Sequence, residues 1–591
     1  MPRLGSFLMS ICIGCLFLCF PELTHAQVRL FLVSDVHSDP EFIVRSAPQI
    51  DVLAQRFLRE NPFGQIVVLV LGDFTSVTPY TRRGFGSHFL QVLHFFSRWR
   101  DYTVLFVPGN HDALDWAIER EIGPDLFLRQ MDDFHGWGVH VLAANMNGKV
   151  EDVQRTVQPS YDLVGARGTR VLGLALEQLV SRSNLSQRMA DNMFTIHSYE
   201  TALQQQLVRA YADGVKNLVL AVHDGFDVVS TLGAQVKRVA QSRGINIAVV
   251  AAADDHDVHT INADGTLYLD AGSKGRFTMA DLREDGTYLS KSAIHYGIPG
   301  DHEKRIEEGV ELELVTATSG VPHVMLGELA RRWDSWQQDT KTQLDRVLGF
   351  TKKGFQATKK ALMDGPNDLG SLFAETLSHW TRNQPWYDSS VPVVSFFNSS
   401  SYSYEKPIPR GPISELLLRT VIPHIDAAAV YQVSGRELKE LYFSLRDAHP
   451  GCKKKGFTPQ TSFNFRYRNK KIEIFHSSRW QEVEDDGQYF LAVDGFLARH
   501  QDGGAWRIEE WVKIFNSRLP QGEVIFQDLL VDTFPGIVSL FEEGKLGFTV
   551  QREVQRRAVL AKWASRGEEK KTKFVRGSSS RRCESVNAGL F

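Results

Sequence analysis

The stretch VRLFLVSDVH, residues 28–37, joins an apolar run to a carboxylate and an imidazole, and four later stretches repeat this design. Further apolar, β-branched runs occupy residues 66–71, 103–107, 217–222 and 246–252. Runs of this kind, separated by longer amphipathic stretches, predict the buried strands of an α/β sheet. Each run ends at or near a polar block, and the blocks are Asp35-Val36-His37, Gly72-Asp73, Gly109-Asn110-His111-Asp112, His223-Asp224-Gly225 and Asp255-His256-Asp257-Val258-His259.

The position of these blocks predicts one shared site. Ligand sites of open α/β sheets form in the loops at the carboxyl ends of the strands. Carboxylate, imidazole and amide groups in this combination suit a pair of divalent metals, which is the equipment for hydrolysing a phosphate ester. Any one block is weak, since Asp-x-His or Gly-Asp occurs by accident in many proteins. Their common order and placement indicate a dinuclear metal site.

Composition sets the broad class. With 591 residues and 43% hydrophobic content, the chain should form two or more globular domains. The formal net charge of −3 gives no overall attraction to nucleic acid or to a membrane surface. We therefore expect a small-molecule substrate and no nucleic-acid partner, while the oligomeric state stays open.

The amino terminus predicts export. Residues 1–26 combine Arg3, a short apolar stretch and small residues before Gln27, as in a secretory signal peptide. The alternative is a membrane anchor, but the run is shorter than the ~20 residues that span a bilayer. Lipid attachment at Cys15 is a further alternative. We expect a secreted or periplasmic protein whose mature chain has no integral membrane segment.

Shifts in pattern along the chain predict its domains. The α/β alternation covers residues 27–325, and residues 326–385 form a helical junction and the start of a second domain. Residues 386–563 mix short strands with helices, as in an α+β fold. Residues 564–591 are polar, charged and Ser-rich, which predicts a disordered tail. Of five cysteines, only Cys452 and Cys583 follow the predicted signal, which excludes a disulfide framework.

The five blocks resemble those of the calcineurin-like metallophosphoesterases. The resemblance implies that Asp35 and His37 bind one metal, that Asn110, His223 and His256 bind the other, and that Asp73 bridges both. It also implies two divalent ions, whether Zn, Mn, Fe or Co, and a metal-bound hydroxide as nucleophile.

Two further roles follow from the same resemblance. His111 would face the phosphoryl group, oriented by a carboxylate for which Asp115 is the first choice and Asp112 the second. The last block departs from the usual Gly-His-x-His pattern. Either a one-residue insertion lets His259 bind the metal of Asp35 and His37, which we favour, or that ligand is missing or supplied otherwise.

The second half resembles the two-domain periplasmic or extracellular 5′-nucleotidases. The segments that carry this resemblance are 141–145, 368–372, 411–414, 421–423, 433–439 and 496–504. The resemblance implies that Phe496 stacks on the base, with Phe457 or Phe463 on its other face, and that Asp502 binds the ribose. The expected fold is a calcineurin-like metallophosphoesterase sandwich joined by a helical segment to an α+β 5′-nucleotidase domain.

The substrate pocket departs further from the family pattern. Asn398 lacks the Arg that should follow it to meet substrate phosphate, and Lys406 or Arg410 are the candidates to replace that Arg. The main hypothesis is a nucleotide phosphohydrolase. The alternatives are an enzyme for cyclic nucleotides, nucleotide sugars or a non-nucleotide ester, and a catalytically weak nucleotide-binding relative.

Overall fold

The computed structural model describes most of the chain between Val28 and Glu542. The described residues are 28–39, 41–76, 87–112, 123–177, 179, 193–256, 258–273, 275–289, 294–297, 311–314, 324–358, 361–362, 367–398, 406–422, 428–447, 459–494, 512–513 and 526–542. The predicted signal peptide and the predicted polar tail lie outside them. The chain divides between Ser335 and Trp336, within helix α10 (Val324–Leu344), into two compact units.

Two β-sheets form the centre of the first unit. Among the described residues, the first sheet has eight strands in the order β16-β15-β14-β1-β2-β3-β4-β6. Their bounds, in that order, are Glu311–Leu314, Ile294–Gly297, Phe277–Leu282, Val28–Val33, Gln65–Val70, Thr103–Phe106, Val139–Leu142 and Val157–Gln158. The second sheet has six strands in the order β12-β13-β11-β10-β8-β7. These span Val258–Ala263, Thr266–Ala271, Asn246–Ala252, Asn217–Val222, Thr169–Leu174 and Ser160–Asp162.

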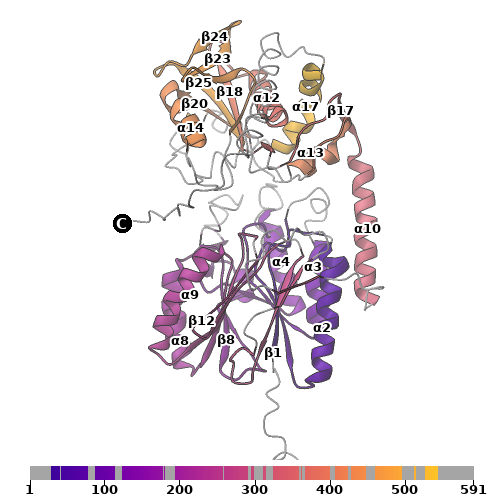
Figure 1. The fold of residues 1–591 in the computed structure, drawn as a ribbon, viewed down its shortest axis with the longest axis vertical. Coiled ribbons are helices and arrows are strands. Elements are labelled where there is room, and N and C mark those ends of the chain that lie inside the picture. Colours follow the sequence, from indigo (N-terminus) through magenta and orange to yellow (C-terminus); the bar gives the residue numbers. More distant parts are fainter. Residues whose placement is uncertain are drawn as a thin grey trace, which may run out of the picture. The chain divides into compact units, whose positions relative to one another are not determined.

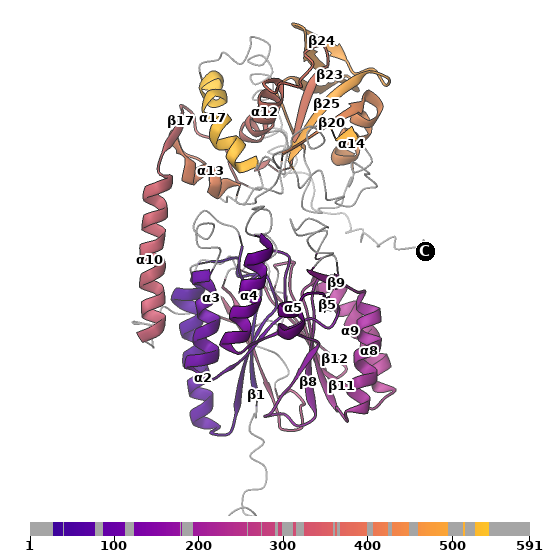
Figure 2. The same cartoon turned by 180° about the vertical axis from the view of Figure 1, so that it is seen from behind.

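The two sheets pack face to face and carry helices on their outer faces. One apolar core lies between them and includes Leu30 and Leu69 of the first sheet with Val219 and Val249 of the second. Helices α2 (Ala47–Glu60) and α3 (Ser87–His94) lie on one side of this unit, and α8 (Tyr199–Ala212) and α9 (Phe226–Gln241) lie on the other (Figures 1 and 2). The predicted α/β sandwich of the first domain is confirmed.

The remaining elements of the first unit are short or peripheral. They are π-helices η1 (Phe42–Ser46) and η3 (Phe95–Trp99), helices α4 (Gly123–Trp137) and α5 (Glu151–Thr156), and the paired strands β5 (Met146–Gly148) and β9 (Phe194–Ile196).

The strands that were expected to carry the polar blocks are β1, β2, β3, β10 and β11. All five occupy the predicted positions to within a residue or two. They are buried along almost their whole length, as continuous apolar runs require. β1, β2 and β3 are parallel neighbours in one sheet, and β10 and β11 are parallel neighbours in the other.

The second unit has an α+β fold built on a five-stranded sheet. Its strand order is β21-β18-β25-β20-β26, with bounds Pro459–Thr461, Val393–Asn398, Gln488–Asp494, Ala428–Ser434 and Val512–Lys513. Smaller sheets pair β17 (Val347–Thr351) with β19 (Gly411–Ser414), and β22 (Phe465–Arg468) with β23 (Lys471–His476) and β24 (Arg479–Glu482). The helices are α12 (Asp368–Arg382), α13 (Glu415–Val421), α14 (Gly435–Asp447) and α17 (Phe526–Glu542).

The start of the second unit differs from the predicted helical segment. Helix α10 ends at Leu344, and β17 begins at Val347 and pairs antiparallel with β19. The β-branched ends of β17 and its distant partner outweigh the helical pattern of the preceding residues. Helix α12 lies within the segment predicted to be helical, and it contributes Leu369, Leu372 and Phe373 to the core of this unit.

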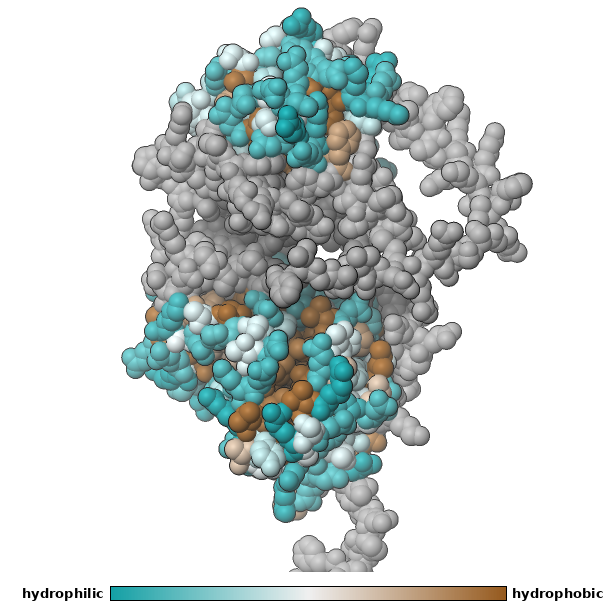
Figure 3. Space-filling view, turned by 90° about the vertical axis from the view of Figure 1, so that its left-hand side faces the viewer, coloured by the Kyte–Doolittle hydropathy of each residue, from teal (hydrophilic) through white to brown (hydrophobic). Residues whose placement is uncertain are grey.

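The hydropathy of the surface and of the helices can be compared with that of a membrane span. In the face shown in Figure 3, hydrophilic residues cover most of the described surface and hydrophobic areas are scattered among them. Within the described ranges, no helix has both the length and the apolar character needed to cross a bilayer.

Candidate metal centre

The five predicted loops meet at the carboxyl ends of their strands. Past the end of β1, the amides of Asp35 and His37 continue the ladder and donate to the carbonyls of Gly72 (3.2 Å) and Asp73 (2.8 Å). Gly109 passes so close to Asp73 that an added Cβ would lie 2.2 Å from Asp73 Oδ1. Only glycine fits there, because the two loops pack backbone against side chain.

One group of ligand atoms joins the loops after β1 and β11. His37 Nε2 and His256 Nε2 lie 3.1 Å apart, and both face Asp35 Oδ1, at 3.9 and 3.7 Å. Asp35 is completely buried, and its Oδ1 has no hydrogen-bond partner among the described residues. Two imidazole nitrogens directed at a buried, orphaned carboxylate oxygen form a set that fits a cation.

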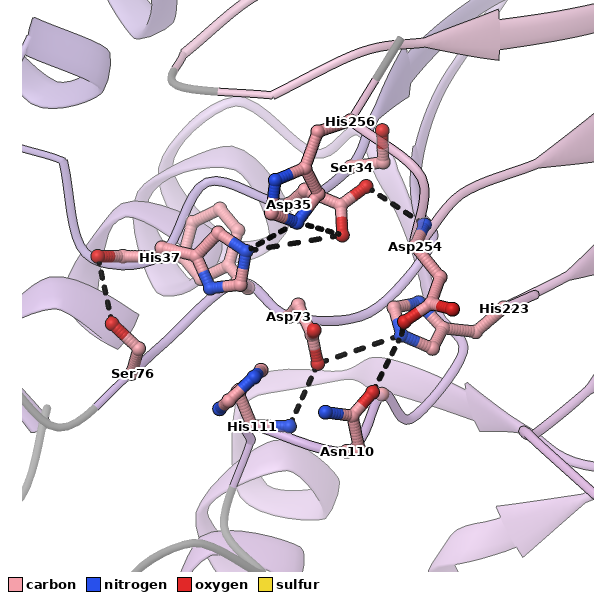
Figure 4. A network of polar contacts seen from close by, with 12 residues as sticks. Ser34, Asp35, His37, Asp73, Ser76, Asn110, His111, His223, Asp254 and His256 are labelled. Atoms are coloured by element: carbon pink, nitrogen blue, oxygen red, sulfur yellow. Dashed lines mark hydrogen bonds and ion pairs between the residues drawn. The ribbon is translucent and has the colours of Figure 1, made fainter. Parts of the chain in front are cut away.

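A second group lies around His223. Its Nε2 is 3.4 Å from Asn110 Oδ1, 3.5 Å from Asp73 Oδ1 and 4.0 Å from Asp254 Oδ1. Figure 4 shows Asp73 between this group and the group of Asp35, His37 and His256. Ligand atoms of Asp35, Asp73 and His223 also lie within 4.8 Å of one another. The two groups are therefore adjacent, and Asp35 has ligand atoms in both of these sets.

The backbone selects the tautomer of His223. Its Nδ1 lies 2.5 Å from the carbonyl oxygen of Leu71, and a carbonyl only accepts hydrogen bonds. Nδ1 therefore carries a proton and donates it. In the neutral ring this leaves the lone pair on Nε2, which faces Asp73 and Asn110.

The site concentrates negative charge where water is excluded. Burial raises the pKa of Asp35 well above its ordinary value, and the carboxylates of Asp73 and Asp254 add to the shift. Burial acts in the same direction on Asp73, but His223 and His111 overcome it and lower the pKa of Asp73. Burial favours neutral His223, yet Asp73 and Asp35 raise its pKa well above the usual range. Without a cation, these carboxylates therefore favour the protonated form of His223.

Asp112 holds two of the loops together. Its Oδ2 accepts from the amides of Asp73 (3.0 Å) and Gly109 (2.8 Å), and its Oδ1 accepts from Phe74 (3.0 Å) and Thr75 (3.2 Å). Burial and the nearby Asp73 carboxylate raise the pKa of Asp112 to about 7, against the effect of the amides. Both oxygens of Asp112 are therefore engaged by backbone amides, and the residue ties the loop after β2 to the loop after β3.

Several site residues adopt left-handed backbone conformations. Among the non-glycine residues with positive φ are Asp35 (47°), His37 (51°), Asp73 (49°), Asp254 (77°) and His256 (64°). Such conformations are unfavourable for residues with a Cβ and occur where surrounding contacts enforce them. Here they let alternate residues of a short loop direct their side chains into the same space.

Two predictions for the last block are wrong. His256 groups with Asp35 and His37, not with Asn110 and His223. His259 is not in either candidate metal group of the described residues. It lies in β12, where its ring stacks on Phe226 with centroids 4.3 Å apart.

Asp254 is the site residue that the sequence interpretation missed. Strand β11 ends at Ala252, two residues before it. If the Gly-His-x-His spacing is applied from Ala253, Asp254 takes the place of the first His and His256 that of the second. The sequence analysis placed the Gly position of this pattern at Asp255, two residues too late. The end of β11 at Ala252 is the signal that could have corrected this placement.

The other predicted site residues lie in different parts of the chain. His111 lies beside the centre: its amide donates to Asp73 Oδ1 (2.7 Å) and its ring is 5.2 Å from that of His37. Phe463 is fully buried and stacks on Phe541, so it has no free face for a base and belongs to the core; this prediction is wrong. Arg410 is exposed, and Asn398 is the last residue of β18. Asp115, Phe457, Phe496 and Asp502 lie outside the described residues.

Fold and site together define a metal-dependent phosphoester hydrolase. Comparison with family models gives calcineurin-like phosphoesterase for residues 28–227 and 5′-nucleotidase, C-terminal domain, for residues 347–509. The chain belongs to the two-domain calcineurin-like 5′-nucleotidase family.

Solved structures agree with this assignment. A 5′-nucleotidase precursor from Thermus thermophilus is 15% identical, with a TM-score of 0.59 over 86% of this chain and 96% of that one. A 5′-nucleotidase from Candida albicans is 11% identical, with a TM-score of 0.55 over 87% and 99%. The sulfate thiohydrolase SoxB of Thermus thermophilus is 12% identical, with a TM-score of 0.54 over 88% and 95%. At these identities the likeness is one of fold. A search of curated proteins finds no match.

Proposed function

We propose that this chain is an exported enzyme that removes phosphate from nucleotides with two divalent cations held at the ends of β1, β2, β3, β10 and β11. The observation that supports this most is the pair of adjacent ligand groups, which have Asp35 in common and Asp73 between them. Each combines carboxylate with imidazole, and Asp35 contributes a buried oxygen with no hydrogen-bond partner among the described residues.

The proposed ligand sets follow from the distances between the ligand atoms of the two groups. Asp35, His37 and His256 would hold one cation, Asn110, His223 and Asp254 would hold the other, and Asp73 would contact both. Two cations in such a site lower the pKa of bound water and offset the charge that develops on a transferring phosphoryl group. Zn, Mn, Fe and Co all accept this mixture of oxygen and nitrogen donors.

His111 is the proposed residue for the phosphoryl group. Its amide is tied to Asp73, and its ring lies beside that of His37. An imidazolium in this place would donate a hydrogen bond to a phosphoryl oxygen or a proton to the leaving oxygen. Asp115 remains the proposed carboxylate partner that orients it.

The second unit is the basis for proposing a nucleotide. Its family model takes its name from 5′-nucleotidases and covers residues 347–509, which include Phe496 and Asp502. Stacking of a base on Phe496 contributes roughly 1–3 kcal/mol and tolerates different bases. Asp502 would bind the ribose hydroxyls, and Phe457 remains a candidate for the other face of the base.

A different ester is the second candidate. Ser399-Ser400-Ser401 follow Asn398 where the family pattern has an Arg for substrate phosphate, and exposed Arg410 is the proposed replacement. The sulfate thiohydrolase with the same fold shows that the architecture by itself does not select a nucleotide. Cyclic nucleotides, nucleotide sugars and non-nucleotide esters are the alternatives.

A substrate panel distinguishes these candidates. The protein, reconstituted separately with Mn²⁺, Zn²⁺ and Co²⁺, would be assayed with AMP, cyclic AMP, UDP-glucose and p-nitrophenyl phosphate. We expect AMP to give the highest kcat/KM, and Phe496→Ala to lower kcat/KM for AMP by roughly tenfold or more while sparing p-nitrophenyl phosphate. Hydrolysis of UDP-glucose or cyclic AMP in preference to AMP would contradict the proposal.

Export has its own test. Mass spectrometry of the protein released by its native host should find a chain that begins at Gln27. A protein retained inside the cell with its first 26 residues intact would contradict this part of the proposal.

A further inference from the structure

Asp255 lies between two proposed metal ligands and makes contacts outside the centre. Its neighbours Asp254 and His256 contribute atoms to the two ligand groups. The Asp255 carboxylate instead accepts a hydrogen bond from the amide of Phe226, at 2.9 Å from Oδ2. Phe226 is the first residue of α9, so Asp255 caps the amino terminus of this helix from a distant loop.

The same carboxylate oxygen faces His259. Nε2 of His259 is 3.7 Å from Asp255 Oδ2, and the His259 ring stacks on Phe226 with an interplanar angle of 18°. Asp255, His259 and Phe226 thus form a small cluster, which we call the α9 cap cluster. Strand pairing also holds this cluster in place, because His259 in β12 lies opposite the fully buried Asp270 of β13.

The α9 cap cluster also connects the two loops that carry proposed ligands. His223 follows the end of β10 and precedes Asp224 and Gly225, after which α9 begins. The amide of Ala253 donates to the carbonyl of Asp224 at 3.1 Å, one residue before Asp254. Asp255 adds a side-chain contact next to this backbone contact. The loop after β11 is therefore held to the loop after β10 at two nearby points.

From these contacts we propose that Asp255 and His259 are positioning residues, which hold Asp254 and His256 in place by fixing their loop to the start of α9. The inference rests on the proposed metal function. Asp254 and His256 both have positive φ, a conformation that the surroundings must impose. Partners that orient metal ligands in this way commonly change metal affinity by about 10- to 100-fold when they are removed.

Metal binding and Co²⁺ spectroscopy test this proposal. Metal-free wild type, Asp255→Ala, Asp255→Asn and His259→Ala would be titrated with Co²⁺ against a chelator. We expect Asp255→Ala to weaken Co²⁺ binding by roughly 10- to 100-fold and to alter the visible absorption bands of the bound ion. Asp255→Asn keeps an oxygen for the Phe226 amide and should recover most of the affinity. His259→Ala should retain two ions per chain with weaker binding.

Asp264→Asn is the matched control, because Asp264 is an exposed acid at the far end of the β12–β13 hairpin. The proposal would be overturned if Asp255→Ala bound Co²⁺ with wild-type affinity and showed wild-type absorption bands. This holds even if the metal-free variant has a lower Tm than wild type. Loss of one ion per chain in His259→Ala would also overturn it, since His259 would then be a ligand. Failure of wild type to bind two ions would instead contradict the proposed function.

Discussion

Asp254 makes the second ligand group rich in oxygen. That group offers carboxylates from Asp73 and Asp254, an amide oxygen from Asn110 and one imidazole from His223. The first group offers two imidazoles, from His37 and His256. Carboxylate and carbonyl oxygens suit harder cations such as Mn²⁺, whereas imidazole suits Zn²⁺. The two halves of the centre should therefore differ in metal preference.

Replacing Asp254 tests this difference. Asp254→His adds an imidazole and removes a carboxylate, so we expect the affinity ratio of Zn²⁺ to Mn²⁺ at one site to rise by on the order of tenfold. Competition titrations of the two metals would measure it. Asp264→Asn should leave the ratio unchanged, and an unchanged ratio in Asp254→His would show that residue 254 is not a ligand.

Metal binding should also depend on pH in a defined direction. Asp73 and Asp35 raise the pKa of His223 against the effect of burial, which favours the protonated ring in the metal-free site. A cation needs the neutral imidazole and must displace this proton. Affinity should therefore rise with pH until the raised pKa is passed. Calorimetry at pH 7 in buffers of different ionisation enthalpy should detect net proton release; proton uptake would contradict the assignment.

The five predicted strands are correct because each is a short apolar run with polar residues at its carboxyl end. Position and burial follow from that pattern. The pattern does not predict which of the two sheets a strand joins. A strand in either sheet is buried on both faces and shows the same apolar run. The start of β17 was missed because its partner β19 lies far along the chain.

The hydrogen bonds of Asp112 to the loops after β2 and β3 should contribute strongly to the stability of the protein. Asp112→Asn leaves one oxygen for four backbone amides and places an NH₂ group against donors. We expect the metal-free protein to lose about 2–6 kcal/mol of stability, given about 1–3 kcal/mol for each of the two buried donors left without an acceptor. Denaturant unfolding would measure this. Asp101→Asn, at an exposed loop acid, should change stability little; equal effects would contradict the role of Asp112.

The molecule consists of two units with separate apolar cores. One core lies between the sheets of the first unit, and another surrounds α12 and α17 of the second. Composition and pattern predicted this division because 591 residues exceed what one core supports. The ligand positions at residue level were harder. His256 and His259 are equivalent as residue types, and only the end of β11 and the pairing of β12 with β13 distinguish them.

Both ligand groups belong to the first unit, which has a thermodynamic consequence. We expect scanning calorimetry to resolve two unfolding transitions, with added Mn²⁺ raising only one of them. At a free metal concentration of about 100 times Kd, binding stabilises the first unit by about 2.7 kcal/mol per site. A single transition, or equal shifts of both, would contradict separate units. Asp73→Asn should abolish most of the shift.

The metal content of Asp73→Asn, measured together with its activity, tests the central claim most directly. Mn²⁺-reconstituted wild type and variant would be analysed by elemental mass spectrometry and by hydrolysis of p-nitrophenyl phosphate. We predict two ions per chain in wild type, at most one in Asp73→Asn, and a loss of activity of roughly 1,000-fold or more, because the shared carboxylate is removed. Two ions and full activity in the variant would contradict a dinuclear centre bridged by Asp73.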